Sequence, residues 1–550
     1  MKQKIERVEV NMEELKALLE RAKTAVLEER DYNQLKAAVE TLGYLTQIIE
    51  DNKTTIERLR QILFGASTEK SRNVLKRGAE QTGGEHSEGP TLRGIVDRDR
   101  EESQNKSKGH GRNGAEAYRS ATTIKVSYDS LKPGDRCPEC QKGKVYHNTP
   151  GYLVRIVGQA PLAATVYELE KLRCNLCGEV FRAEAPQGVG PQKYDETSAS
   201  MIALLKYGSG VPFNRLEQLQ GNIGVPLPAS TQWEIVKETA EVIEPAFGEL
   251  IRQAAQGEVI HNDDTTMKVL ALMSREPPPE QSQQEESQRR GMFTSAIVSR
   301  CAGRTIALFF TGHKHAGENL SAVLAQRAAK LGPPIQMCDA LSRNLPGEFK
   351  VVLAHCLAHS RRKFVDVVRQ FPEECRYLLK TLAEVYRNDA LSRQQGMSPE
   401  ERLRFHQEKS GPPINDLESW LKEQLEEGKV EPNSGLGQAI SYMKKHWGKL
   451  TMFLQVAGAP LDNNICERAL KKVILHRKNS LFYKSPNGAH VGDLFMSIIH
   501  TCQLNGVDPF GYLTELQKHA AKLSQTPQHW MPWNYRDTLQ QERSADGADS

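Results

Sequence analysis

The six residues EVIHND, Glu258–Asp263, mark the point where the chain changes from helical to strand-like periodicity. Three more strand-like stretches follow: TSAIVS (294–299), RTIALFF (304–310) and PIQMCD (334–339). A helical stretch at 318–330 separates the last two of these strands, and two strands joined through such a helix are most simply parallel neighbours. We therefore expect a mixed α/β core in which Asp263 and Asp339 lie at matching strand ends.

Two insertions interrupt this core, which we place at residues 251–484. The stretch 273–291 is rich in Glu, Gln, Ser and Pro and separates the first two strands, which indicates an insertion in a hairpin. A basic helix is expected at His355–Phe364, where His355, Cys356 and His359 suggest either a metal site or a packed basic helix. A largely helical insertion at 366–437 follows it.

The core ends in the amphipathic helix LDNNICERALKKVILHRKN, residues 461–479, with Glu467 at the edge of its apolar face. From Lys444 to Lys484 there are nine Lys or Arg residues against two acids, although the whole chain carries only +4. Positive charge is thus concentrated around Glu467, as a site that holds a polyanion and a metal ion together requires.

Three carboxylates, those of Asp263, Asp339 and Glu467, share this core. Hard oxygen ligands suit Mg²⁺ or Mn²⁺, and a two-metal site supports in-line phosphoryl transfer. Asp264 follows Asp263 directly, and strand alternation puts the two on opposite faces, so only one can be a ligand there. We expect substrate phosphates to contact a set of nearby cations, Arg361, Arg362, Lys363, Arg468, Lys471, Arg477 and Lys478.

The two N-terminal regions differ sharply in composition. Residues 1–70 lack proline and carry an a/d heptad pattern from Leu35 to Leu63, which predicts a self-associating coiled coil or, alternatively, an amphipathic hairpin packed on its own chain. Residues 71–120 are rich in glycine and charge and poor in large apolar side chains, which is typical of a flexible basic linker.

Residues 121–186 hold two CxxC pairs separated by strand-like segments, which predicts a small β zinc ribbon that binds DNA. Each pair places two thiolates on one tight turn, and two turns supply the four ligands of a tetrahedral structural Zn²⁺. The ligands would be Cys137, Cys140, Cys174 and Cys177.

Residues 187–250 are helical, with a turn near Gly208 and a new helix start at Ser230, compatible with a helix-turn-helix DNA reader or a plain helical scaffold. Residues 485–550 form a C-terminal helical segment and tail. The 550 residues, of 61.6 kDa, include neither a signal peptide nor an apolar run long enough to span a membrane. We therefore expect a cytoplasmic multidomain α+β protein.

Six ordered blocks resemble the bacterial insertion-sequence-66 family of DDE transposases. They are IHNDDT (260–265), QMCDALSRN (336–344), HCLAHSRRKF (355–364), LDNNICERALK (461–471), HRKNSLF (476–482) and CQLNGVDPFGYL (502–513). The resemblance also covers ILFGASTEK (62–70), at the end of the family's leucine-zipper region, and the zinc-binding segment. Asn262, Asp264 and the Ala-Leu-Ser after Asp339 depart from the family pattern.

The resemblance implies a ribonuclease H-like core with Asp263, Asp339 and Glu467 as the catalytic, Mg²⁺-binding triad, and it selects Asp263 over Asp264. It implies a DNA transposase that nicks the ends of its insertion sequence and joins the freed 3′-hydroxyl to target DNA. The expected partners are transposon-end and target DNA, further copies of the chain and accessory proteins of the same element, with the protein on the nucleoid when bound. The alternatives are a catalytically decayed DNA-binding protein of the same family and a structure-specific nuclease.

Overall fold

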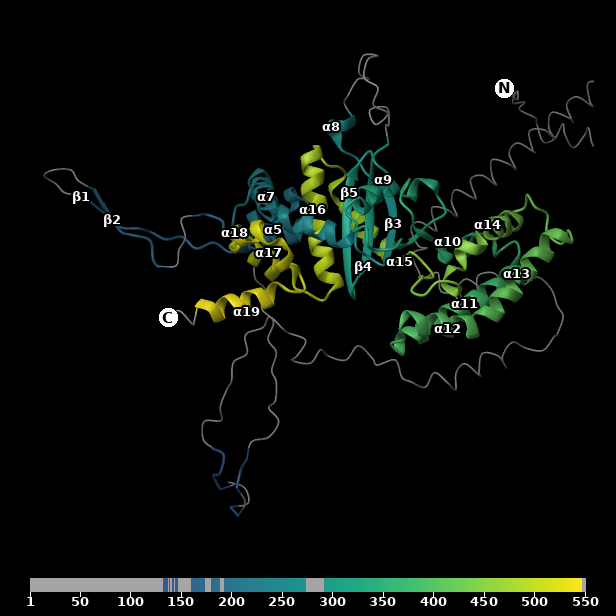
Figure 1. Ribbon diagram of the computed structural model, residues 1–550. Coiled ribbons are helices and arrows are strands. Elements are labelled where there is room, and N and C mark those ends of the chain that lie inside the picture. The colour runs from purple at the N-terminus through teal and green to yellow at the C-terminus, as the bar shows by residue number, and fades with distance from the viewer. Residues whose placement is uncertain are drawn as a thin grey trace, which may run out of the picture. The chain divides into compact units, whose positions relative to one another are not determined.

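A computed structural model describes residues 192–273 and 291–546, together with shorter pieces between residues 132 and 187. At its centre is a mixed five-stranded sheet among many helices, so the domain is α+β (Figure 1). The order across the sheet is β5-β4-β3-β6-β7. The strands are β3 (Val259–Thr266), β4 (Phe293–Cys301), β5 (Arg304–Gly312), β6 (Ile335–Cys338) and β7 (Val352–His355).

The predicted hairpin is present, because β3 and β4 pair antiparallel along their whole length and β4 pairs antiparallel with β5. The 273–291 insertion lies between β3 and β4, mostly outside the described residues. The prediction that the strands on either side of the helix α9 (Ala316–Leu324) are neighbours is wrong. β6 instead joins the other edge of β3, in parallel, because the connection through α9 crosses the sheet.

β7 was not expected from the sequence, and it changes the start of the basic helix. β7 pairs in parallel with β6 and ends at His355, so α10 begins only at Leu357 and runs to Val367. The prediction that His355 and His359 share one helix is therefore wrong. Only His359 lies on α10.

The outer edge of the sheet is sealed by α16 (Pro486–Leu504), which lies alongside β5 (Figure 1). Four polar residues lie one turn apart along α16, and the last of them is its C-cap. Their side chains accept hydrogen bonds from the outward-facing N–H groups of every second residue of β5. The pairs are Asp493 with Thr311, Ser497 with Phe309, Thr501 with Ala307 and Asn505 with Thr305. Two residues of strand and four of helix span nearly equal lengths, so the two ladders match and the edge has no free donors.

Helices before and after the sheet complete a shared hydrophobic core. The long helix α7 (Ala229–Ala254) packs against β4, β5 and α16 and buries Val236, Ile243 and Leu250. Around it lie α5 (Glu196–Ala203), the π-helical turn η2 (Leu204–Gly208), α6 (Phe213–Asn222), α17 (Pro509–Lys518) and α18 (Ala520–Gln525). The short helix α8 (Leu270–Met273) follows β3, and α19 (Tyr535–Asp546) closes the described chain.

The second predicted insertion is helical. It contains α11 (Pro372–Gln394), α12 (Pro399–Lys409) and α13 (Gly411–Glu426), followed by α14 (Gly435–Leu450) and α15 (Asn464–Ser480). Residues 364–383, which hold the end of α10 and the first half of α11, belong to a separate unit. Among the described helices, none combines the length and apolar character needed to cross a membrane.

The predicted coiled coil at 1–70, the linker at 71–120 and the four zinc-ligand cysteines lie outside the described residues. The segments next to the cysteines are described in part. Arg136 and Lys144 form an antiparallel bridge on either side of the first CxxC pair. β1 (Lys171–Arg173) and β2 (Val180–Arg182) pair antiparallel on either side of the second.

Candidate active site

Asp263 and Asp339 come from neighbouring parallel strands in matching register. β3 and β6 pair His261 with Met337. Continued two residues further, the same register sets Asp263 opposite Asp339, which directly follows the last residue of β6. Asp263 is not at a strand end, because β3 continues to Thr266 beside β4. Both side chains are partly exposed where the β6 ladder stops.

Glu467 lies in the first turn of α15, which packs on β3 and β4. The odd-numbered residues of β3 face this helix: His261 Nδ1 bonds Asn463 Oδ1 at 3.1 Å, and Arg477 donates to Thr265 Oγ1 at 3.2 Å. Asp263 lies between these two contacts on the same face of the strand. Asn463 also donates to the Asn262 carbonyl oxygen at 3.1 Å, which fixes the start of α15 against β3.

The charges of the three acids act on one another. Burial and, to a smaller extent, the negative charges of Asp339, Asp264 and Glu467 together raise the pKa of Asp263 to about 7, against a hydrogen bond from the Asp264 amide that lowers it. Among the described residues, however, the oxygens of these three acids do not form a group that lies within 4.8 Å of one another.

Asp264 points to the opposite face of the sheet and has other partners. Its carboxylate is 2.9 Å from His315 Nδ1 and 3.2 Å from an Arg343 nitrogen, and its side chain is only 1% exposed. The Asp264 carboxylate is thus already occupied by a hydrogen bond with His315 and an ion pair with Arg343. This geometry favours Asp263 over Asp264 as the acid of the site.

A second cluster borders Glu467. Donor atoms of Cys356, His359 and Glu467 lie within 4.8 Å of one another, with His359 Nδ1 3.8 Å from Glu467 Oε1. Cys356 accepts a hydrogen bond from the Asn463 amide at 3.2 Å, and burial raises the pKa of its thiol to about 12. The three donor atoms are close enough to share one metal ion, and His359 Nδ1 borders Glu467 Oε1 without a hydrogen bond between them.

The predicted DNA-binding cations have different surroundings. Arg362 is 3.9 Å from Glu467 Oε2, and Lys363 Nζ lies 4.4 Å from the centre of the Tyr442 ring. Arg477 is held by Thr265 and Thr266 of β3, so it ties α15 to the sheet. The remaining cations on this helix, Arg468, Lys471 and Lys478, are exposed.

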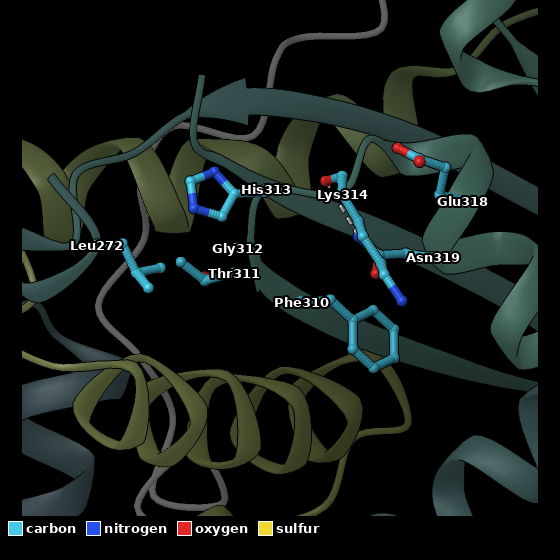
Figure 2. A pocket seen from close by; sticks show the side chains of 8 residues that line it. All are labelled: Leu272, Phe310, Thr311, Gly312, His313, Lys314, Glu318 and Asn319. Atoms are coloured by element: carbon cyan, nitrogen blue, oxygen red, sulfur yellow. Dashed lines mark hydrogen bonds between the residues drawn. The ribbon is translucent and has the colours of Figure 1, made fainter. Parts of the chain in front are cut away.

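Two cavities flank this region. The larger, of about 770 Å³, runs from the start of β3 to the start of α15, and its lining includes four arginines, Arg300, Arg393, Arg402 and Arg468. The smaller, of about 270 Å³, lies where β5 ends and α9 begins, between Phe310, His313 and Asn319 (Figure 2). Neither cavity is lined by Asp263, Asp339 or Glu467, and these three side chains are only partly exposed.

Carboxylates on two neighbouring parallel strands, bordered by cations, are typical of a site that acts on a polyanion. The comparison with known families agrees: residues 193–491 match the Transposase IS66 family, so this chain belongs to that family.

The chain is similar to three uncharacterized proteins of Sinorhizobium fredii (strain NBRC 101917 / NGR234). It is 28% identical to protein y4hP over 390 residues, 67% of each chain. It is 35% identical to y4jD over 34% of this chain and 36% of that protein. It is 26% identical to y4qI over 62% of each chain. Two of these matches span less than two thirds of the relative.

Proposed function

We propose that this protein is a DDE-type DNA transposase that binds the ends of an insertion sequence and catalyses metal-dependent strand cleavage and strand transfer. The observation that carries the proposal is the register of β3 and β6, which, continued past His261 and Met337, would set Asp263 opposite Asp339. The helix α15, which carries Glu467, packs on β3. Family membership supports the reaction class.

The sheet supports a ribonuclease H-like assignment of the core. Three antiparallel strands, β5, β4 and β3, continue into two parallel strands, β6 and β7, with a helix between β5 and β6. In this arrangement β6 ends beside the middle of β3, where the first two acids would lie.

The acids fit Mg²⁺ or Mn²⁺. All three offer carboxylate oxygens, and Glu467 Oε1 is buried without a hydrogen-bond partner among the described residues. Burial and, to a smaller extent, repulsion from neighbouring acids raise the pKa of Asp263, and a bound dication would offset both by favouring the charged carboxylate. When bound, Mg²⁺ would stabilise the negative charge that develops at phosphorus during phosphoryl transfer.

The residues of the chain then have separate tasks. Asp263, Asp339 and Glu467 would hold the metal, and His359 and Arg362 would orient Glu467 from α10. Lys363, Lys471, Lys478 and the other predicted cations would contact DNA phosphates. No nucleophilic side chain is required, because water and then the freed 3′-hydroxyl attack phosphorus.

The test is cleavage of a duplex carrying the terminal repeats of the element, with Mg²⁺, by wild type and by Glu467→Gln. We expect wild type to nick and join strands, and Glu467→Gln to bind the same DNA with at least a hundredfold loss of cleavage. Glu238→Gln, at an exposed site on α7, is the matched control and should cut like wild type. Cleavage by Glu467→Gln at the wild-type rate would contradict the proposal, and nicking without strand transfer would indicate a nuclease.

The remaining regions are proposed to assemble the complex. Cys137, Cys140, Cys174 and Cys177 would bind structural Zn²⁺ in a DNA-binding ribbon, because each CxxC pair falls between antiparallel segments. The heptads of residues 1–70 would join copies of the chain. Accessory proteins of the same element are further expected partners.

A further inference from the structure

The residues that follow the catalytic helix form a strained turn. Leu481 has φ 66° and ψ −45°, and the Phe482 amide donates to the Ser480 carbonyl oxygen at 2.8 Å. These values define the rarer form of γ-turn, which is disfavoured for any residue with a Cβ. A leucine is held in this conformation only where its surroundings enforce it.

The turn is fixed on both sides, yet its side chains face solvent. Leu481 N donates to the Arg477 carbonyl oxygen at 2.8 Å, and Tyr483 N donates to that of Lys268 at 2.9 Å. The Tyr483 ring is 6% exposed and stacks on His476 with centroids 5.0 Å apart. Leu481 and Phe482, by contrast, are 64% and 42% exposed. The fold therefore presents a rigid apolar pair at the surface.

The surroundings of this pair are positively charged. No acid occurs in the sequence between Glu467 and Lys484. Lys478, Lys484 and Lys268 are exposed around the turn. Arg477, one turn before Leu481, bonds Thr265, two residues along β3 from Asp263. The apolar pair thus lies within a cationic surface, at the opposite end of α15 from Glu467.

We propose that Leu481 and Phe482 form a wedge that enters the base stack of bound DNA, about 20 Å along α15 from Glu467. The inference rests on the proposed function and adds to it the group that distorts the substrate. Cations hold the backbone while an apolar side chain replaces a neighbouring base, which is how proteins unstack or kink a duplex. The backbone on one side of the strained turn is bonded to α15, and on the other side it is bonded to Lys268. These bonds hold the two side chains of the wedge in their exposed position.

The test measures base unstacking without catalysis. A terminal-repeat duplex carries 2-aminopurine about 20 Å from the cleavage site, and binding is followed in EDTA so that cleavage plays no part. Wild type should raise the 2-aminopurine fluorescence severalfold. The double variant Leu481→Ala, Phe482→Ala should bind about tenfold more weakly and leave the fluorescence near that of free DNA. Phe349→Ala, at a site 40% exposed just before β7, is the matched control and should act like wild type.

Leu481→Gly provides a second variant that cannot fail through misfolding, since glycine accepts positive φ without strain. It should raise the melting temperature and still weaken unstacking. Wild type that binds DNA without a fluorescence rise overturns the wedge but leaves the transposase proposal standing. Wild type that binds no DNA overturns both. A change of oligomeric state in the double variant, with unstacking intact, would assign the pair to a protein interface and overturn the wedge.

Discussion

Replacing Asp263 by Asn should stabilise the metal-free protein at neutral and alkaline pH. Burial and three nearby acids raise the pKa of Asp263 from 3.8 to about 7. Between these values the folded state keeps a proton that the unfolded state has lost, so the free energy of unfolding falls as the pH rises. A shift of three pKa units corresponds to about 4 kcal/mol, the upper value of the gain in the Asn variant above pH 7.

The assay is urea unfolding of wild type and Asp263→Asn at about pH 4 and pH 8, in EDTA and in Mg²⁺. At pH 4 the two proteins should be nearly equal, since the wild-type carboxyl is protonated when folded. At pH 8 in EDTA the variant should be more stable. Mg²⁺ should stabilise wild type but have little effect on the variant, because it has lost a charged ligand.

Asp264→Asn is the matched control, one residue along the same strand. It weakens the contacts of the Asp264 carboxylate with His315 and Arg343, so it should destabilise the protein by about 1–3 kcal/mol at pH 8. The two neighbouring substitutions should therefore have opposite signs. If Asp263→Asn destabilises as Asp264→Asn does, the acids do not repel one another and the carboxylate cluster is not a cation site.

Three further predictions concern other charged groups. Burial raises the pKa of Asp389, but its partners His406 and Arg402 lower it to about 2, so Asp389→Asn should lose about 2 kcal/mol at pH 7. In urea titrations this loss should shrink as the pH falls from about 4 to about 2. Burial lowers the pKa of Lys206 to about 8, so the stability of wild type should rise with pH between about 8 and 10, and Lys206→Met should abolish that rise in thermal melts. Elemental analysis should find one Zn²⁺ per chain in wild type and much less in the double variant Cys140→Ser, Cys177→Ser.

Much of the sheet follows from sequence periodicity, whereas its strand order does not. Alternating and β-branched stretches predicted β3, β4, β5 and β6 within a few residues. β7 was missed because VLAH is a four-residue strand directly before a helix, with too few residues to show a period. The α9 connection predicts parallel strands but cannot tell which edge of the sheet β6 joins, and the neighbour expected for it was wrong.

The sequence of α16 contains a pattern that indicates how the edge of the sheet is closed. Asp493, Ser497, Thr501 and Asn505 recur every four residues on an otherwise apolar helix, and buried polar groups need partners. Such a polar stripe predicts a ladder of unpaired backbone donors, which only an edge strand supplies. The identity of that strand still required the fold.

The site was predictable as a set of acids but not as a geometry. The choice between Asp263 and Asp264 depends on His315 and Arg343, which approach Asp264 from distant parts of the sequence. Likewise, the role of His359 depends on its distance to Glu467 on another helix. A pattern along one strand shows that the two acids face opposite ways, and only the partners on each face show which acid is free.

The helix that carries Glu467 is also bonded to β3 at both ends. These bonds fix the position of the Glu467 side chain relative to the strand that carries Asp263. Asn463 bonds His261 before Glu467, and Arg477 bonds Thr265 and Thr266 after it. A helix held at one end only can rotate or slide, and a shift of one residue would turn Glu467 by about 100° away from Asp263. With both ends bonded to one strand, the carboxylate of Glu467 keeps its place, although the charges of the other acids repel it. The same two contacts set where α15 must stop, so the strained turn at Leu481 is the consequence of a helix whose register is fixed by its site.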